Sequence, residues 1–355
     1  MSRNNQITRR DSCILFRSRG QKRSFYLHMC TYHSTSIENK TILKDKKKNG
    51  KEQPWKEKKV ANVQYYELLE ILQFKKAARV STCAEILEFD VTKEGRLKLA
   101  HAWFCKSPLC PICNWRKTMK RSVQTTKIVS EVIRRKPVAR WLFLTLSLKN
   151  VFSGEELDVS LKEMAEGFRR LMMYKKVKKN LVGFMRATEV TTNKMSGSYN
   201  QHMHVLICVE SVYFKDSDNY ISQEEWTNLW KKAMKLDYTP IVHIEKVKNK
   251  KKNKNKEMTA IEAAVQETAK YSVKDADYLT GNLKNDLEVV KDLEEGLYRK
   301  RMVAYGGLLK EIHKELNLDD VEEGDLIRVD DESEEDEKAY SVVAQWNWKL
   351  KNYFI

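Results

Sequence analysis

The sequence lacks any apolar run that approaches the roughly twenty residues needed to cross a lipid bilayer. This excludes a membrane-spanning helix, and we expect no membrane partner. The first residues, Met1-Ser-Arg-Asn-Asn-Gln-Ile7, also lack the apolar centre of a secretory signal peptide. We therefore expect a cytoplasmic protein whose seven cysteines are thiols or metal ligands rather than disulfides.

Acidic side chains are too few to balance the basic ones. Lys and Arg number 66 and Asp and Glu 49, so the formal net charge of +17 indicates a polyanionic partner. Lysines are clustered at residues 44–59 and 246–256, and eight tryptophans suit stacking on unpaired bases. A merely soluble basic surface is the alternative, and it explains the clustering less well.

The most informative motif is His202-Met203-His204. It lies inside the apolar run 201–209, whose pattern predicts a strand. Successive strand side chains point to opposite faces, so both imidazoles share one face while Met203 and Val205 point into the core. Two neutral imidazoles so placed can hold one divalent cation. Packed or surface histidines are the alternative for the pair taken alone.

A segment with helical periodicity, residues 262–274, follows about sixty residues later. Glu267 and Tyr271 are four apart and hence neighbours on one helical face, with Lys270 and Lys274 close by. A tyrosine that attacks a phosphate, a carboxylate that activates water and a bound metal would suit phosphodiester cleavage. The alternative for Tyr271 is a half-buried helix aromatic.

A cysteine cluster precedes both motifs. Cys105-Lys-Ser-Pro-Leu-Cys110-Pro-Ile-Cys113 has the paired spacing of a zinc knuckle, and its Cys-Pro-x-Cys turn brings two thiolates to one ion. A structural Zn²⁺ needs four ligands; we expect Cys83 as the fourth, with His101 as the alternative. Ordinary core thiols are the competing interpretation.

Three blocks in order resemble the motifs of plasmid rolling-circle replication initiators, which are HUH endonucleases: Arg140-Trp-Leu-Phe-Leu-Thr-Leu-Ser147, His202-Met-His204, and Glu267-Thr-Ala-Lys-Tyr271. The nearest branch has a single tyrosine with a glutamate four residues before it. The resemblance extends from about residue 54 to 327 and includes residues 220–226 and 304–307. It implies a bacterial, plasmid-encoded enzyme that binds the double-strand origin.

The resemblance also implies a mechanism. Mg²⁺ or Mn²⁺ would be held by His202, His204 and Glu189, where the family places an acidic or polar third ligand. Tyr271 would cut one origin strand to give a 5′-phosphotyrosine and a free 3′ end, and Glu267 would activate water for the terminating cleavage. A solvent-facing carboxylate is the open alternative for Glu189, and Tyr278 is a less favoured second nucleophile.

Basic residues near these motifs are expected to contact DNA. Lys270 and Lys274 accompany the tyrosine motif, and Arg116 begins the basic run 116–121 directly after the cysteines. A solvated charged face is an equal alternative for that run. The lysine-rich segment 248–256 is expected to be a mobile loop facing DNA phosphates.

We expect an α+β fold with four parts. Residues 1–53 would be a flexible basic arm, 54–135 a helical zinc module, 136–285 the HUH nuclease domain, and 286–355 a helical C-terminal region with an acidic, flexible surface stretch at 319–337. The nuclease domain would have a central antiparallel sheet of about five strands, a number that comes from the resemblance. Strands are expected at 141–149, 182–191, 201–209 and 240–247, and helices at 156–178 and 224–236.

The predicted function is a metal-dependent, site-specific single-strand DNA endonuclease and strand transferase that initiates plasmid replication. Its expected partners are the origin DNA, single-stranded at the nick site, and the host helicase and polymerase. Two alternatives stay open: a related HUH transposase or relaxase, and an inactive zinc-containing DNA-binding protein.

Overall fold

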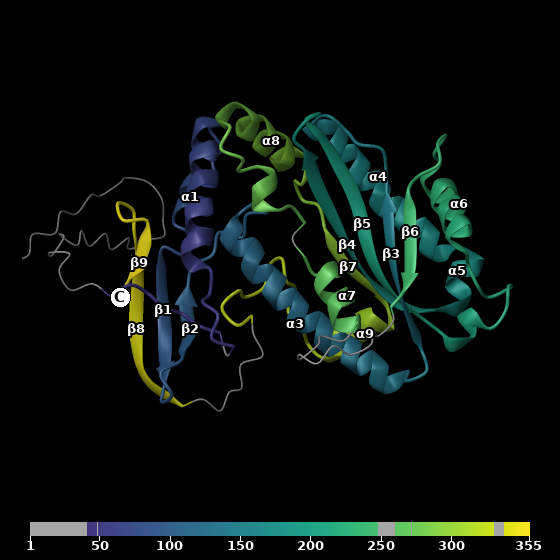
Figure 1. Cartoon of the computed structure of the whole chain (residues 1–355), viewed down its shortest axis with the longest axis horizontal. Coiled ribbons are helices and arrows are strands. Elements are labelled where there is room, and N and C mark those ends of the chain that lie inside the picture. Colours follow the sequence, from purple (N-terminus) through teal and green to yellow (C-terminus); the bar gives the residue numbers. More distant parts are fainter. Residues whose placement is uncertain (1–40, 48, 248–259, 271, 330–336) are drawn as a thin grey trace, which may run out of the picture. The chain divides into compact units, whose positions relative to one another are not determined.

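The computed structural model describes residues 41–47, 49–247, 260–270, 272–329 and 337–355. They form an α+β fold with two antiparallel sheets (Figure 1). One sheet has the strand order β6-β3-β5-β4-β7 and the other β2-β1-β8-β9. The α+β class and the five-stranded antiparallel sheet are confirmed, and the second sheet is an addition to the prediction.

The five-stranded sheet is built around a long hairpin of β4 and β5. Its strands are β3 (Arg140–Ser147), β4 (Leu181–Asn193), β5 (Ser198–Val209), β6 (Val242–Lys246) and β7 (Val303–Gly307). One face is covered by α4 (Gly154–Met173), α5 (Lys175–Asn180) and α6 (Gln223–Met234), and the other by α3 (Pro111–Arg135), α7 (Ala260–Thr268) and α9 (Leu308–Glu315) (Figure 1).

Alternation along β5 decides which side chains meet which helices. Met203, Val205 and Ile207 pack in the cluster with α4 and α6, as predicted for the first two. Leu206 and Cys208 pack in the cluster with α3, α7 and α9. Because side chains of a strand alternate, His202 and His204 face the α3 side of the sheet.

Local sequence signals explain where the covering helices begin. Pro111 occupies the first turn of α3, where its missing N–H costs no hydrogen bond. The Ser153 hydroxyl accepts from the Glu156 amide at the start of α4. Ser222 and Glu225 form a reciprocal capping box that starts α6.

The second sheet joins segments from both ends of the chain. It contains β1 (Ile86–Thr92), β2 (Leu97–Ala102), β8 (Lys338–Asn347) and β9 (Asn352–Phe354), and its core cluster includes residues of α1 (Trp55–Ile71) and α2 (Ala77–Ser81). Trp55, Phe89 and Trp346 are buried in that core. Trp346 therefore docks on the fold, a point that the sequence leaves undecided.

The predicted helical C-terminal region is wrong in part. It contains α8 (Leu283–Gly296) and α9, but β7 completes the five-stranded sheet, and β8 and β9 complete the other one. The reason is pairing with distant strands: residues 338–345 of β8 run antiparallel to the whole of β1. Alternate burial of Ala344 and Trp346 supplies its inward face.

The described residues of the predicted flexible arm at 1–53 are held by hydrogen bonds. Residues 1–40 and 48 lie outside the described residues, but residues 41–47 and 49–53 are held against the fold. The Leu43 amide donates to the Tyr353 carbonyl at 3.1 Å, and the Trp55 indole donates to Asp45 at 2.7 Å. The described part of this arm is therefore ordered by hydrogen bonds with β9 and α1.

A glycine permits the sharp passage from β7 into α9. Gly307 has φ of +59°, and a Cβ there would lie 2.4 Å from the Val182 carbonyl oxygen. Any other side chain would be strained by the backbone and would collide with β4. Within the described part of the chain, no helix is both long and apolar enough to cross a membrane.

Candidate metal centres

Glu189, His202 and His204 come together on the α3 side of the five-stranded sheet. His202 lies on β5 directly opposite Glu189 on β4, and His204 is one pleat further along β5. Glu189 Oε2 is 3.4 Å from Nε2 of each histidine. Glu189 is buried and both histidines are half-buried. The structure thus unites the three residues that the sequence predicts as a divalent-metal site.

The ring nitrogen of His202 that faces away from Glu189, Nδ1, has a partner that fixes the tautomer of the ring. His202 Nδ1 lies 3.1 Å from Asn200 Oδ1, while Asn200 Nδ2 donates to Asn150 Oδ1 at 2.9 Å. Because the Asn200 amide group is used elsewhere, its oxygen faces the ring, and Nδ1 of His202 carries the proton. Nε2 then points toward Glu189, the position from which it could bind a metal ion.

His204 is fixed from the neighbouring strand. Its Nδ1 lies 3.2 Å from the hydroxyl of Thr145, which stands directly opposite on β3. Phe143 stacks on its ring with centroids 5.5 Å apart. The threonine oxygen can accept a hydrogen bond from Nδ1–H, which leaves Nε2 of His204 available to a cation. Contacts of this kind orient metal-ligating imidazoles in many proteins.

The Glu189 carboxylate is ionised. Burial raises its pKa, but the contacts with His202, His204 and Lys274 outweigh burial, so the pKa lies well below its ordinary value. Lys274 Nζ is 2.8 Å from Glu189 Oε1, and this hydrogen bond raises the pKa of Lys274. Lys274, predicted to contact DNA, is paired in the structure with the candidate metal ligand.

The donor set fits a divalent cation. One carboxylate oxygen and two imidazole nitrogens lie within 4.8 Å of one another. Two histidines and one carboxylate bind a metal on one side and leave its other positions for water or a phosphate. The geometry is therefore suited to a divalent cation.

The four predicted cysteines form a second donor cluster. Cys113 Sγ is 3.6 Å from Cys83 Sγ and 3.7 Å from Cys105 Sγ, and the Cys110 and Cys83 sulfurs are 3.7 Å apart. A tetrahedral zinc with Zn–S bonds of about 2.3 Å has sulfur–sulfur edges of about 3.8 Å. The arrangement fits a structural Zn²⁺. Cys83 is the fourth member, and His101 is exposed on β2.

Polar groups surround these sulfurs. The Lys106 amide donates to Cys113 Sγ at 3.2 Å, and Asn62 Nδ2 donates to Cys110 Sγ at 3.4 Å. Lys59 is fully buried beside them, and its ammonium donates to the carbonyls of Ser81 and Cys83, both at 2.7 Å. Burial lowers the pKa of Lys59, and nearby thiolates and Glu85 partly offset this. A retained charge on Lys59 would offset part of the negative charge of four thiolates.

The tyrosine motif departs from its predicted helix. Tyr271 lies outside the described residues, and α7 ends at Thr268. Arg121 of α3 donates to the Lys270 carbonyl at 3.1 Å, and the Ser272 carbonyl accepts from the Val190 amide at 2.8 Å. These carbonyls bond to α3 and β4 instead of continuing the helix, which is why the predicted helix to 274 is too long.

Glu267 lies in the last turn of α7. Its carboxylate pairs with Lys270, three residues on, and both side chains are exposed. The predicted neighbourhood of Glu267 and Tyr271 was argued from an unbroken helix, which the structure does not have beyond Thr268. The role predicted for Glu267 therefore stays a proposal that rests on the motif.

Comparison with known proteins adds the family. The model of the replication protein family Rep_1 matches residues 96–354. The chain belongs to this replication protein family. A replication protein of Staphylococcus aureus is 59% identical over 237 residues, which are 67% of this chain and 99% of that protein. A "Protein rep" of Lactiplantibacillus plantarum is 50% identical over 317 residues, 88% of this chain and 99% of its own length. No solved structure matches.

These matches confirm the sequence-based assignment at the level of a replication protein. In this Rep_1 chain, however, Arg116 does not serve as a surface contact for DNA. Its guanidinium is buried, donates to the carbonyls of Leu326 at 2.9 Å and Ile327, and lies over Trp55 at 5.3 Å. The prediction for Arg116 is therefore wrong, because distant backbone and an aromatic ring satisfy its charge.

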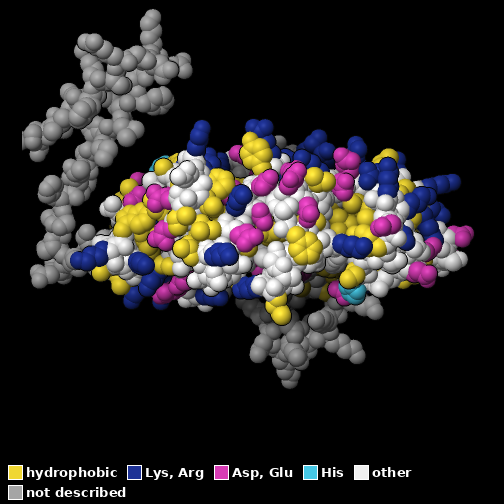
Figure 2. All heavy atoms as spheres, turned by 90° about the horizontal axis from the view of Figure 1, so that it is seen from above, with side chains coloured by type: hydrophobic (Ala, Val, Ile, Leu, Met, Phe, Trp, Pro, Cys, Tyr) yellow, Lys and Arg dark blue, Asp and Glu magenta, His cyan; other side chains and the backbone are white. Residues whose placement is uncertain are grey.

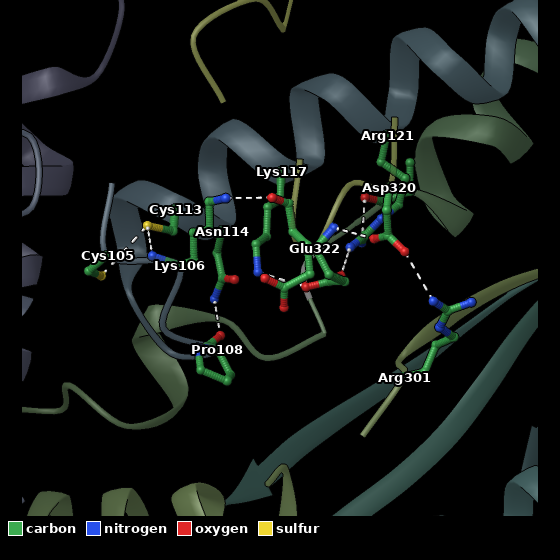
Figure 3. A network of polar contacts seen from close by, with 12 residues as sticks. Cys105, Lys106, Pro108, Cys113, Asn114, Lys117, Arg121, Arg301, Asp320 and Glu322 are labelled. Atoms are coloured by element: carbon green, nitrogen blue, oxygen red, sulfur yellow. Dashed lines mark hydrogen bonds and ion pairs between the residues drawn. The ribbon is translucent and has the colours of Figure 1, made fainter. Parts of the chain in front are cut away.

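The acidic stretch of this family member does not form a free surface over its first part. Residues 319–325 lie along α3 (Figure 3), where Glu322 pairs with Lys117 at 2.7 Å and with Arg121 at 3.0 Å. Lys120 pairs with Asp319 at 2.8 Å. The predicted flexible, solvating stretch is wrong for these residues because the buried cations of α3 bind them. Residues 330–336 lie outside the described part of the chain.

Tyr278 is a structural residue of the Rep_1 fold. It is fully buried, its hydroxyl donates to the Leu109 carbonyl, and its ring meets Tyr65 edge-on with centroids 6.0 Å apart. Burial raises its pKa well above the ordinary value. These contacts disfavour it as a second nucleophile. The predicted lysine loop at 248–256 lies outside the described residues.

Several residues of the two centres were missed by sequence reasoning. The position of Asn200 could have been predicted, since it lies two residues before His202 and hence on the same strand face. Thr145 lies in the motif Arg140–Ser147, but only the register of β3 and β5 shows that it faces His204. Lys59 and Arg121 had no local signal, because each acts on carbonyls distant in sequence.

Proposed function

We propose that the chain initiates rolling-circle replication of a plasmid by nicking one strand of its origin. The observation that carries this proposal is the convergence of Glu189, His202 and His204 at the centre of an antiparallel sheet, in a member of a replication protein family. The histidine strand beside the Glu189 strand is the arrangement expected of an HUH endonuclease domain. The protein would act on origin DNA in the bacterial cytoplasm.

Mg²⁺ or Mn²⁺ is the proposed cofactor of this centre. Glu189, His202 and His204 would hold the ion, which when bound would neutralise charge on the scissile phosphate. Asn200 and Thr145 hold the imidazoles in the orientation required. The protein therefore fixes the ligands before the ion and the DNA arrive, which lowers the cost of assembling the centre.

Tyr271 is the proposed nucleophile. Its phenol oxygen would bond to the phosphorus, the bond from phosphorus to the 3′ oxygen would break, and the 3′ oxygen would leave as a hydroxyl after gaining a proton. The phenol proton would pass to solvent. Support comes from the motif and from Ser272 and Lys274, which bond to Val190 and Glu189 at the candidate metal centre. The free 3′ end would then be extended by the host polymerase on a template opened by the host helicase.

Glu267 is proposed to activate water for the second cleavage, after one round of replication. Its carboxylate is exposed at the end of α7 and pairs with Lys270. Lys270 is exposed and remains a candidate DNA contact. Exchange of Lys270 between the carboxylate and a DNA phosphate would free Glu267 to accept a proton.

The cysteine cluster is proposed to hold one structural Zn²⁺. It joins the start of α3 to the segment before β1, through Cys110, Cys113 and Cys83. No open position would remain once four thiolates surround the ion, which is typical of structural rather than catalytic zinc. Its expected contribution is to folding.

The test of the function is strand-specific nicking of supercoiled parental plasmid in Mn²⁺. We expect the purified protein to nick and to form a covalent adduct, and Tyr271→Phe to lose both while still binding the origin. His202→Ala should lose metal-dependent cleavage, whereas His101→Ala, an exposed histidine of the other sheet, should not. A covalent adduct formed by Tyr271→Phe would show that another residue attacks.

A further inference from the structure

A cationic groove lies beside the candidate metal centre. It has a volume of about 350 Å³ and is lined by Arg301, Tyr305, Lys310 and Lys314, with Asp320 and Glu322 along one side. Lys310 and Lys314 are exposed and four residues apart on α9, so they share one helical face. Within the described residues, no ion pair engages either lysine. The groove therefore presents two unneutralised cations.

The groove opens on the same side of the sheet as the metal ligands. Val303 of β7, which lines the groove, is directly opposite Ala187, and Ala187 is directly opposite His204. Residues paired across an antiparallel sheet share a face, and neighbouring strands are about 4.8 Å apart. Strand β7, which lines the groove, therefore lies about 10 Å from strand β5, which carries the histidines.

The acidic segment of the chain already places a carboxylate in this groove. Asp320 Oδ2 pairs with Arg301 at 3.0 Å, and both side chains are largely exposed (Figure 3). An exposed pair of this kind contributes little to stability and exchanges readily with another anion. Glu322, in contrast, is held by the mostly buried Lys117 and Arg121. Asp320 Oδ1 accepts from the Glu322 amide at 2.8 Å, so the replaceable contact is the one between Asp320 Oδ2 and Arg301.

A nucleic-acid backbone suits this groove better than an acidic protein does. Lysines bind phosphates as point charges without needing a defined geometry. Lys310, Lys314 and Arg301 bring three positive charges to this one groove. On the face displayed in Figure 2, acidic side chains are interspersed among the Lys and Arg side chains. The groove, in contrast, is lined by three cationic side chains, of which Arg301 is paired with Asp320.

We propose that this groove binds the phosphate backbone of the DNA strand next to the nick site, and that Asp320 occupies Arg301 when DNA is absent. The proposal rests on the proposed function in one respect, that DNA is the substrate. It assigns DNA contacts to Arg301, Lys310 and Lys314, whereas the sequence motifs pointed to residues around Tyr271.

The first experiment measures binding of fluorescently labelled single-stranded oligothymidylate to the full chain over a range of salt concentrations. The double variant Lys310→Gln/Lys314→Gln should bind more weakly, and its slope of log affinity against log salt should be flatter by about 1.4, since each lost single-strand phosphate contact removes about 0.7. Melting followed by circular dichroism should be unchanged, because both side chains are exposed.

The matched control is Lys175→Gln/Lys179→Gln. These two lysines are also exposed and four apart on a short helix, but α5 covers the opposite face of the sheet. The net charge falls equally in both double variants. Equal losses of affinity and equal slopes would mean that only net charge matters, and this would overturn the groove as a DNA site.

The second variant tests the exchange at Arg301. Asp320→Asn should bind oligothymidylate more tightly than wild type, and more so than Asp218→Asn, which removes an exposed carboxylate on the α6 side of the sheet. Equal gains would overturn the role given to Asp320.

If wild type binds DNA but neither nicks nor forms an adduct, the proposed function fails while the binding comparison still decides the groove. If wild type nicks and the groove variants match the control pair, the groove alone is wrong.

Discussion

Single residues at the candidate metal centre act mainly by orienting others. Asn200 fixes the His202 tautomer because its own amide group is committed to Asn150. The strand alternation that placed His202 and His204 on one face could be predicted from sequence, and so could the approach of Glu189 through the hairpin. The partners of the two Nδ1 atoms could not be predicted, because they depend on the strand register and on the orientation of the Asn200 amide.

Removing the Asn200 contact should weaken the metal centre without abolishing it. We expect Asn200→Ala to lower Mn²⁺ affinity by about 10–100-fold, the usual effect of losing a hydrogen bond that orients a histidine ligand. Mn²⁺ titration followed by electron paramagnetic resonance measures this directly. Asn193→Ala, in the turn of the same hairpin, is the control, since the Asn193 side chain bonds only to turn amides. Equal affinities in both variants would contradict the orienting role.

The Glu267 carboxylate should matter for termination and not for initiation. Glu267→Ala is expected to nick and to form the Tyr271 adduct, but to accumulate covalent protein or overlong strands because no base activates water. Gel analysis of adducts on a regenerated origin separates the two steps. Glu262→Ala, in the first turn of the same helix, is the control. Equal loss of both cleavages in Glu267→Ala would make the carboxylate a structural group.

Among the elements, α3 links most parts of the site. Its basic run looks like a solvated surface in the sequence, yet Arg116, Lys117, Lys120 and Arg121 are buried against partners about 150 to 210 residues away. No local pattern distinguishes such a run from a DNA-binding face. The early end of α7 could not be predicted for the same reason, because it depends on Arg121 reaching the Lys270 carbonyl.

Two cations of α3 share Glu322, and only one of them also holds the chain before Tyr271. Arg121→Met should therefore slow adduct formation more than Lys117→Met, although both remove an ion pair with Glu322. Single-turnover rates at saturating origin oligonucleotide measure this, and Arg121→Lys should recover part of the rate. Equal slowing in both Met variants would show that Glu322 docking, and not the Lys270 contact, is what matters.

At the scale of the whole molecule, the cysteine cluster ties together segments that the sequence prediction assigned to separate parts. Its neighbours in the core include Trp55 and Trp115 from the N-terminal side and Trp346 from the C-terminal side. The cluster itself was predictable from its spacing. The second sheet around it was not, because β1 finds its partner β8 only through long-range pairing.

Loss of the proposed zinc should therefore unfold this core. Cys110→Ser is expected to release one zinc per chain and to change tryptophan fluorescence, because the free energy of zinc binding contributes to folding. Cys208→Ala, a buried thiol on β5 away from the cluster, should keep the zinc and the fluorescence. Elemental analysis that finds no zinc in wild type purified without chelator would contradict the site.

The pairing of β1 with β8 also has a consequence for synthesis on the ribosome. Lys338, the first residue of β8, follows the last residue of β1 by 246 positions. At about 5–20 residues per second, β1 waits roughly 12–50 s for its partner after it is translated. During that interval one edge of β1 has only β2 beside it and the other is open to pairing with foreign strands. Messages broken before codon 338 would yield chains that keep this edge, so such fragments should aggregate or be degraded and should not accumulate as truncated protein.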